Sequence, residues 1–303
     1  MRVVLVGSVE SSKVAFDALV NAGKPPVLVV TLPKEAADRH SDFADIGSRA
    51  AEMGIPVYYT TLINSPEALK AIESAAPDVT LVIGWSQICK ASFRAIARIG
   101  SIGFHPAALP LLRGRGVIPW TILLGEKTAG STLFWLDEGT DSGPILLQEN
   151  FHVAADETAR SLYLKHMHNI EEMVPEAMRL LERGDAPRIG QDHSQASYCA
   201  KRTPEDGLID WRQPAWQILT LIRAVGDPYP GAYTHCNGFK LHIDVAAPAA
   251  ETPRYIGVTG QVQAHTPSGF VIMCGDGRCI EARHWRSQNG KPPPVHSKLV
   301  SLP

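Results

Sequence analysis

His105 is the side chain in this sequence best suited to move a proton. It stands in the segment SIGFHPAALPLLRGRGVIPW (101–120), where little else is polar before the first arginine. An imidazole titrates near neutral pH, so it can take a proton from an amine or give one to a leaving group. A carboxylate orients such a ring, and Asp141 in the glycine-rich loop LDEGTDSGP (136–144) is the candidate. Together the two residues predict general acid–base chemistry.

Two arginines between these residues could bind an anionic substrate. Arg113 and Arg115 belong to an Arg-Gly-Arg-Gly run, in which Gly114 lets the backbone approach a ligand or simply makes a tight turn. Trp120 and Trp135 could stack on a base or pack in the core. Each feature also has a plainer interpretation, because His-Pro pairs are often structural, an Asp in such a turn often bonds its own backbone, and arginines are often solvated. The residues alone leave both interpretations open.

The composition indicates a globular protein with two domains. The chain has 303 residues, and a chain of this length usually forms more than one hydrophobic core. Hydrophobic residues make up 45% of it, which is enough to form such cores. The net charge of −2 weighs against a polyanionic partner. Five scattered cysteines without zinc spacing predict reduced thiols and no metal site. The opening MRVVLVGSVE predicts a strand rather than a secretory signal, and no apolar run reaches about 18 residues, so we expect a cytoplasmic protein that does not span a membrane.

Apolar runs alternate with amphipathic segments through the first half of the chain. The predicted strands are residues 2–6, 25–31, 55–61 and 78–85, and the predicted helices are 8–23, 36–54 and 65–77. Continuous apolar strands separated by helices are typical of a parallel sheet covered on both faces. Such sheets bind ligands beyond the carboxyl ends of their strands, which favours the loop after Gly84 and the segment around His105. The first turn, GSVESS, lacks the GxGxxG pattern of a dinucleotide site.

The second half predicts a further strand and helix, a linker and a small β domain. The strand is 149–154, and the helix is 156–184, which Pro175 should kink or split. The polar, aperiodic residues after it predict an interdomain linker, and short alternating strands with glycine turns then indicate a small antiparallel barrel. The expected organisation is an α/β catalytic domain over 1–187, a linker over 188–206 and an OB-like β-barrel over 207–303.

Several ordered motifs make the chain resemble the 10-formyltetrahydrofolate-dependent formyltransferases. They are the opening MRVVLVG, the loop VIGWSQI, the segments HPAALPLLRG and DEGTDSGPILLQ, and the later RTPEDGLIDW and RAVGDPYPGAY. The resemblance covers nearly the whole chain. It implies the formyltransferase fold, a Rossmann-like and mostly parallel sheet followed by a small C-terminal barrel. It also implies the co-substrate N10-formyltetrahydrofolate and a primary amine as acceptor.

The resemblance assigns roles to particular positions. The histidine that handles protons matches His105, and the aspartate that supports its charged form and helps a bound water relay the proton matches Asp141. The pterin pairs with main-chain groups of two loops, which here are Trp85, Ser86, Gln87, Ile88 and Cys89 in the first, and Asp137, Glu138, Gly139, Thr140 and Asp141 in the second. The residues expected to contact the acceptor are Pro106, Arg113, Gly114 and Arg115.

Gly103 departs from the family pattern. The family carries an asparagine two residues before the histidine, and its amide donates to the formyl oxygen, whereas this chain has glycine there. The loss of one oxyanion donor costs about 10²–10³ in rate, or roughly 3–4 kcal/mol. Three explanations stay open: a water molecule or a backbone N–H group fills the space, protonated His105 carries the oxyanion alone, or the protein binds its ligands but turns over poorly.

Charge is the guide to the acceptor. The tRNA-directed branch of the family carries a basic loop after the second strand, but the matching segment here, TLPKEAADRHSDFADIG, offsets Lys34 and Arg39 with four acidic residues. Phosphate contacts come from Lys and Arg, so we expect a small acceptor, a nucleotide-linked amino sugar, and no nucleic-acid partner. The alternatives are methionine carried by tRNA, water in a hydrolase that releases formate, and a folate- or nucleotide-binding homologue that has lost catalysis. A homodimer and a monomer are both compatible with the family.

Overall fold

The structure, a computed structural model, describes residues 1–39, 42–288 and 290–300. The chain divides into two compact units. Unit 1 comprises Met1–Val117, Lys127–Val153 and Tyr163–Ala200, and unit 2 comprises Ile118–Glu126, Ala154–Leu162 and Lys201–Pro303. Unit 1 holds every strand of the expected α/β domain, and unit 2 holds the expected β domain.

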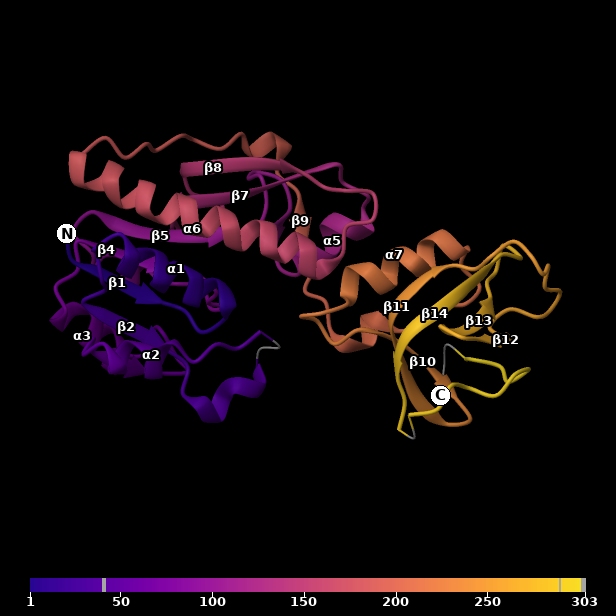
Figure 1. The fold of residues 1–303 in the computed structure, drawn as a ribbon. Helices are drawn as coiled ribbons and strands as arrows, with labels where there is room; N and C mark the ends of the chain where they lie inside the picture. The colour runs from indigo at the N-terminus through magenta and orange to yellow at the C-terminus, as the bar shows by residue number, and fades with distance from the viewer. Residues whose placement is uncertain (40–41, 289, 301–303) are drawn as a thin grey trace. The chain divides into compact units, whose positions relative to one another are not determined.

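Unit 1 is built on a seven-stranded sheet in the order β3-β2-β1-β4-β5-β7-β8 (Figure 1). The strands are β1 (Val3–Val6), β2 (Leu28–Thr31), β3 (Val57–Tyr59), β4 (Val79–Val82), β5 (Gly100–His105), β7 (Thr128–Trp135) and β8 (Ile145–His152). The first five pair in parallel, and β7 and β8 continue the sheet in antiparallel pairing. Every residue of β1, β2 and β4 is buried, which explains their continuous apolar sequence. The predicted mostly parallel, Rossmann-like sheet is confirmed.

The helices of this part of the chain are α1 (Glu10–Asn21), the 3₁₀ turn η1 (Lys34–Arg39), α2 (Ile46–Glu52), α3 (Pro66–Ser74), α4 (Ala91–Arg94), α5 (Val117–Leu123) and α6 (Ala159–Arg183). The predicted helices agree with these with two exceptions, and the short helices α4 and α5 lie in segments for which the sequence predicts none. α3 starts as its sequence predicts, because the Ser65 hydroxyl accepts from the N–H of Ala68 and proline follows the cap.

The two exceptions have physical causes. The single helix predicted over 36–54 is wrong: η1 ends at residue 39, residues 40–41 lie outside the described chain, and α2 begins only after Asp45, whose carboxylate accepts from the N–H of Ser48. A split of the long helix at Pro175 is also wrong, because α6 continues through that residue. The neighbours Val174, Ala177 and Met178 are fully buried, and this packing outweighs the one backbone hydrogen bond that proline cannot make.

The start of α1 is tightly packed where the strand order reverses between β1 and β4. A Cβ atom on Gly7 would lie 2.1 Å from the Ile83 carbonyl oxygen, and one on Gly84 would lie 2.3 Å from Val9 Cγ2. The Ser12 hydroxyl donates to the same Ile83 oxygen at 2.6 Å. Only glycine fits at these two positions, because β1, the loop after β4 and the start of α1 approach one another so closely.

Unit 2 is an antiparallel sheet in the order β10-β11-β14-β13-β12, with the helix α7 (Ala215–Val225) before it. The strands are β10 (Ala232–Cys236), β11 (Phe239–Pro248), β12 (Val262–Thr266), β13 (Gly269–Met273) and β14 (Cys279–Arg286). The segment near the chain end pairs with both outer parts of this sheet, since Lys298 bridges to Gln261 and Val300 bridges to His235. This segment closes the sheet into a small barrel. Earlier in the chain, the 3₁₀ turn η3 (Pro204–Gly207) precedes α7.

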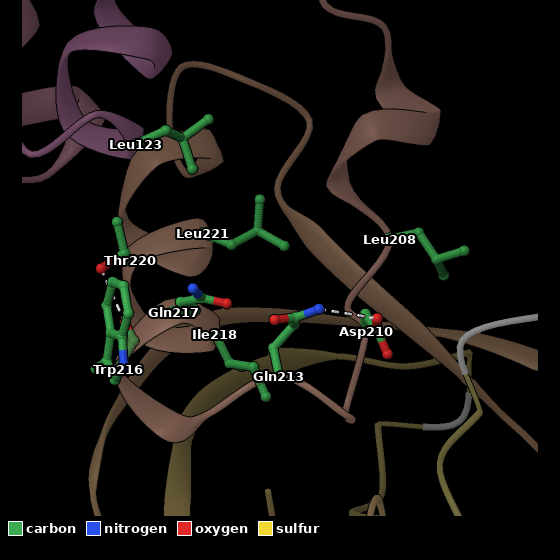
Figure 2. Close-up of a pocket in the computed structure, with 9 residues that line it drawn as sticks. All are labelled: Leu123, Leu208, Asp210, Gln213, Trp216, Gln217, Ile218, Thr220 and Leu221. Atoms are coloured by element: carbon green, nitrogen blue, oxygen red, sulfur yellow. Dashed lines mark hydrogen bonds between the residues drawn. The ribbon is translucent and has the colours of Figure 1, made fainter. Parts of the chain in front are cut away.

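A cavity of about 280 Å³ lies along α7 (Figure 2). Its lining residues are Leu123, Leu208, Asp210, Gln213, Trp216, Gln217, Ile218, Thr220 and Leu221. The only ionisable lining group, Asp210, accepts hydrogen bonds from Arg212, and these lower its pKa to about 2. No lining group exchanges protons near neutral pH, so this cavity is not a candidate for acid–base chemistry.

None of the helices described in the structure is both long enough and apolar enough to cross a bilayer.

Glu281 provides a test of the barrel's stability. Its side chain, on a residue only 9% exposed, accepts from the hydroxyls of Thr266 at 2.6 Å and Ser268 at 2.7 Å and from Arg283 at 2.8 Å. These hydrogen bonds lower its pKa from 4.5 to about 2, so the charged form stabilises the fold above pH 4.5 and this contribution is lost as the pH falls toward 2. We expect Glu281→Gln to lower the free energy of unfolding by about 1–2 kcal/mol at pH 7.

Denaturant unfolding of Glu281→Gln and wild type at pH 7, 4 and 3 measures this effect, with the exposed Glu251→Gln as control. The deficit of Glu281→Gln should shrink between pH 4 and pH 3. A deficit that stays constant with pH would assign the effect to geometry rather than to charge.

Candidate active site

His105 is the last residue of β5, at the carboxyl end of the parallel strands. It is buried, with 4% of the residue exposed, and its ring Nε2 lies 2.7 Å from the carbonyl oxygen of Leu112. A carbonyl oxygen only accepts, so Nε2 carries a proton and donates it. The lone pair of the neutral ring is therefore on Nδ1, which is the nitrogen able to take up a proton.

Asp141 lies in the loop between β7 and β8. The Asp137 carboxylate closes this loop, because it accepts from the N–H of Gly139 at 3.0 Å and from the Ser142 hydroxyl at 2.8 Å. Asp141 has a φ of +51°, in the left-handed region that a non-glycine residue enters only at a cost. Gly143 is required, since a Cβ atom there would lie 1.8 Å from the carbonyl oxygen at the end of β7.

The loop has to double back to reach the histidine. β7 is antiparallel to β5, and its last residue, Trp135, pairs with Ile102 rather than with His105. The chain after Trp135 therefore returns along β5 before it places Asp141 beside the ring. There His105 Nδ1 and Asp141 Oδ2 are 3.5 Å apart, and the same Oδ2 accepts from the N–H of Gly114 at 2.8 Å.

This geometry suits a general base. Nδ1 carries the free lone pair and faces a carboxylate that a backbone N–H holds in place. A proton taken up at Nδ1 would leave an imidazolium next to this anion, which favours the charged ring electrostatically. The two side chains brought together are those that the sequence predicts as a pair.

A side chain at position 103 requires its neighbours to move. Gly103 pairs with Phe134 of β7, and a Cβ atom on it would lie 2.7 Å from Leu136 Cδ2 and 3.0 Å from two ring carbons of Phe134. The space beside Gly103 thus holds apolar carbon atoms of the neighbouring strand and loop. The explanation in which a water molecule or a backbone N–H group enters that space stays a prediction.

The loop over residues 85–89 follows β4 and is fixed to the preceding β3–α3 connection. The Gln87 side chain accepts from the N–H of Ile63 and donates to the Thr61 carbonyl oxygen. The carbonyl oxygens of Ser86, Ile88 and Cys89 accept from Arg115, Asn64 and Arg94 respectively. Within the described residues, the backbone N–H groups of 86–88 donate to no protein atom. They are donors left over for a ligand with acceptor atoms, as a pterin ring has.

The other expected pterin contacts are placed as follows. Burial raises the pKa of the Cys89 thiol to about 12, so this group stays protonated and is no nucleophile. Trp85 is half-buried, and its Nε1 has no hydrogen-bond partner within the described chain. In the second loop Glu138, Gly139 and Thr140 are exposed.

Arg113 is not placed as expected. Only 1% of the residue is exposed, and the guanidinium donates to the Gln191 side-chain oxygen at 2.5 Å, to the Tyr198 hydroxyl at 3.0 Å and to His193 Nδ1 at 3.1 Å. A side chain so enclosed cannot also bind a substrate phosphate. The expected acceptor contact at Arg113 is therefore corrected to a role inside the protein.

The remaining residues expected near the acceptor stay close to His105. Pro106 follows it directly and is half-buried. Gly114 has a φ of +101°, and a Cβ atom on it would lie 2.5 Å from the Cys199 carbonyl oxygen, so only glycine fits this close approach of two chain segments. Arg115 is exposed, and its Nη2 donates to the Ser86 carbonyl oxygen at 2.6 Å, which joins its turn to the 85–89 loop.

The two tryptophans differ in burial. Trp135 is packed in the core of unit 1, where its Nε1 donates to the Pro187 carbonyl oxygen at 2.8 Å and the Arg188 guanidinium lies 3.5 Å from the ring centre. Core packing is therefore confirmed for Trp135. Trp120, in α5, is only half-buried, and the Arg202 guanidinium lies 5.0 Å from its ring centre.

Residues that the sequence did not single out also shape the site. Part of the expected linker forms a short strand, β9 (Tyr198–Cys199), which pairs in parallel with β6 (Arg113–Gly114). From the same segment Gln191 contacts the Asp141 loop. Gln148 of β8 and Thr132 of β7 hold the turn after His105, since both bond to backbone groups between residues 107 and 109. Gln148 ends the DEGTDSGPILLQ motif, but nothing local marks Gln191. Across the described residues, no three His, Cys, Asp or Glu side chains gather as a metal site would.

Comparison with known proteins places both parts of the chain in one family. Residues 1–178 match the formyl transferase family, and residues 201–301 match the formyl transferase C-terminal domain. The chain is similar to the methionyl-tRNA formyltransferases of Symbiobacterium thermophilum, with 32% identity over 92% of this chain and 86% of that one, and of Syntrophus aciditrophicus, with 33% identity over 92% and 89%.

Solved structures agree in fold. HypX from Aquifex aeolicus in complex with tetrahydrofolic acid superposes with a TM-score of 0.69 at 19% identity, over 95% of this chain and 44% of that one. The sugar 3N-formyl transferase WlaRD, in the presence of dTDP and 5-N-formyl-THF, has a TM-score of 0.67 at 19% identity, over 96% and 99%. The chain therefore belongs to the formyl transferase family and is an enzyme that transfers formyl groups.

Proposed function

We propose that this enzyme transfers the formyl group to the amino group of methionine carried by a tRNA, with His105 and Asp141 as its proton-transfer pair. The observation that carries the choice of acceptor is the similarity to methionyl-tRNA formyltransferases, at 30–33% identity over 92% of the chain and through both domains. This reverses the preference for a small acceptor that the charge balance alone gives.

The residues support a direct transfer. The acceptor nitrogen attacks the formyl carbon, and the bond from that carbon to N10 of the folate then breaks. His105 Nδ1 takes the proton that the attacking amine loses, and the proton returned to N10 leaves the folate neutral at that atom. Asp141 faces Nδ1 at 3.5 Å and supports the imidazolium. The free backbone N–H groups of 86–88 bind one edge of the pterin ring, and main-chain groups of the 137–141 loop bind its other edge.

The oxyanion has no side-chain amide at position 103. Phe134 and Leu136 line that side, so the positive charge available to the oxyanion is the imidazolium that forms once His105 Nδ1 has taken up the proton of the amine. Of the three explanations for the glycine, this geometry supports the one in which protonated His105 acts alone.

A nucleotide-linked amino sugar is the second candidate, and one observation favours it. Lys34, in the loop where a tRNA-directed enzyme needs free cations, pairs with Asp45 at 2.8 Å. A lysine so neutralised is a poor phosphate contact. The side chain of Arg39, the other cation of this loop, lies outside what the structure describes.

Acceptors can be compared directly. Purified enzyme with 10-formyltetrahydrofolate is given methionyl-tRNA, a dTDP-linked amino sugar, or no acceptor, and formylated product and free formate are measured. We expect kcat/KM to be highest for methionyl-tRNA and to fall steeply between 50 and 200 mM salt, since phosphate contacts release counterions. Faster, salt-insensitive formylation of the sugar would overturn the proposed acceptor. Formate release without acceptor, or no turnover at all, would overturn transfer itself.

His105→Ala tests the proton carrier. Loss of a positioned general base should lower kcat by about 10²–10⁴-fold and leave the Kd for 5-formyltetrahydrofolate nearly unchanged, because the pterin contacts lie in other loops. The matched control is His168→Ala, an exposed histidine of α6, which should behave as wild type. Full activity in His105→Ala would assign the proton to another group.

Gly103→Asn asks whether the family amide can be restored. The new Cβ atom would overlap Leu136 and Phe134, so we expect loss of about 1–3 kcal/mol of stability and lower, not higher, turnover. Gly103→Ala should lose nearly as much stability, since the Cβ atom alone causes the overlap. An asparagine variant with unchanged Tm and raised kcat would contradict the apolar filling of this position.

A further inference from the structure

Gln191 clamps the loop that carries Asp141. It lies between α6 and β9 and is buried, with 8% of the residue exposed. Its side-chain Nε2 donates to two backbone carbonyl oxygens of the loop, that of Asp141 at 2.9 Å and that of Gly143 at 2.7 Å. One amide group therefore holds the loop on both sides of its turn.

Arg113 fixes the orientation of this amide. Its Nη2 donates to Gln191 Oε1 at 2.5 Å, so the oxygen end of the amide must face the guanidinium and the NH₂ end must face the loop. The guanidinium is itself held by Tyr198 and His193, and within the described residues it has no carboxylate partner. A buried cation without a counter-ion is costly, and here it is used to set the direction of one neutral amide.

The loop needs such a clamp for two reasons visible in its geometry. Asp141 has a left-handed backbone that an aspartate does not adopt by preference. The loop also runs back along β5 before its carboxylate comes within 3.5 Å of His105 Nδ1. The hydrogen bonds of Gln191 go to the backbone of the strained residue itself and of the glycine two positions later.

We propose that Gln191 is a positioning residue of the formyl transfer reaction, which acts through Asp141 and is itself aligned by Arg113. The proposal rests on the role assigned to His105 and Asp141 under the proposed function. Gln191 touches neither reacting atom in this geometry. Its effect on turnover arises because it determines where the Asp141 carboxylate lies relative to the imidazole.

Gln191→Glu is the sharpest test. It keeps the size of the side chain and the contact of Oε1 with Arg113, but it replaces the NH₂ donor by an oxygen that repels both loop carbonyls. We expect a Tm close to wild type, since the carboxylate pairs with the buried guanidinium, and a fall in kcat of about 10²-fold from misplacement of Asp141. Gln195→Glu, the same change at an exposed residue of the same segment, should leave kcat unchanged.

A double-mutant cycle separates positioning from a general structural role. If Gln191 acts through Asp141, Gln191→Glu should lower single-turnover formylation in the wild-type background and change it less than twofold in the Asp141→Asn background. Equal losses in both backgrounds would overturn the proposal. Amide hydrogen exchange adds an independent readout: residues 139–143 should lose protection in Gln191→Glu while β5 and β7 keep theirs, and unchanged protection of the loop would also overturn it.

Failure of the inference can be told apart from failure of the proposed function. Should His105→Ala and Asp141→Asn both retain wild-type turnover, the catalytic pair is wrong and the proposal falls with it. Should both lose turnover while Gln191→Glu keeps it, the pair stands and only the role of Gln191 is wrong. Gln191→Met, which removes donor and acceptor together, must lower kcat as well, because it leaves the loop without its clamp.

Discussion

The 3.5 Å approach of a carboxylate to an imidazole depends on a loop that runs against the direction of its strand. β7 ends opposite Ile102, so the chain must return along β5 before Asp141 can face His105. Local sequence gives this loop its closure, through Asp137, Gly139 and Gly143, but closure alone does not aim the carboxylate. Partners outside the loop orient the Asp141 carboxylate toward His105, and the other contacts of the site support these partners.

The partners come from two segments that are far apart in the sequence. The turn around Gly114 supplies the N–H that holds the Asp141 carboxylate, and the segment after α6 supplies the Gln191 amide that holds the loop backbone. These two segments are joined by β6 and β9 and by the Arg113 guanidinium. Because a buried polar group without a partner costs more than a typical hydrogen bond gains, each of these contacts requires the others.

Much of unit 1 follows from local pattern. Continuous apolar runs such as VVLV and VTLV can be satisfied only by burial on both faces, and Ser65 followed by Pro66 fixes where α3 begins. The pair His105 and Asp141 is also within reach of the sequence, because an imidazole and a carboxylate both carry proton chemistry. The resemblance to a known family then supplies their roles.

Contacts between residues that lie far apart in the chain could not be predicted from the sequence. The segment after α6 is polar and aperiodic, and it looks like a linker because its partners lie 44–89 residues earlier in the chain. Arg113 looks like a solvated or ligand-binding side chain for the same reason: its neutral partners Gln191 and Tyr198 leave no complementary charge to signal burial. Likewise, the continuation of α6 through Pro175 depends on packing that no local rule reports.

Gly103 is also determined by contacts with residues that lie far from it in the sequence. An aromatic ring opposite a strand glycine covers the backbone that the missing side chain leaves bare, and Phe134 takes that position here. The result is an apolar wall where a family member carries a hydrogen-bond donor. His105 itself is buried, so its charge is less screened than in solvent, and an imidazolium there attracts an oxyanion more strongly. The loss of one donor thus makes the exact placement of the remaining charged pair more important, which is the property that the contacts of Asp141 secure.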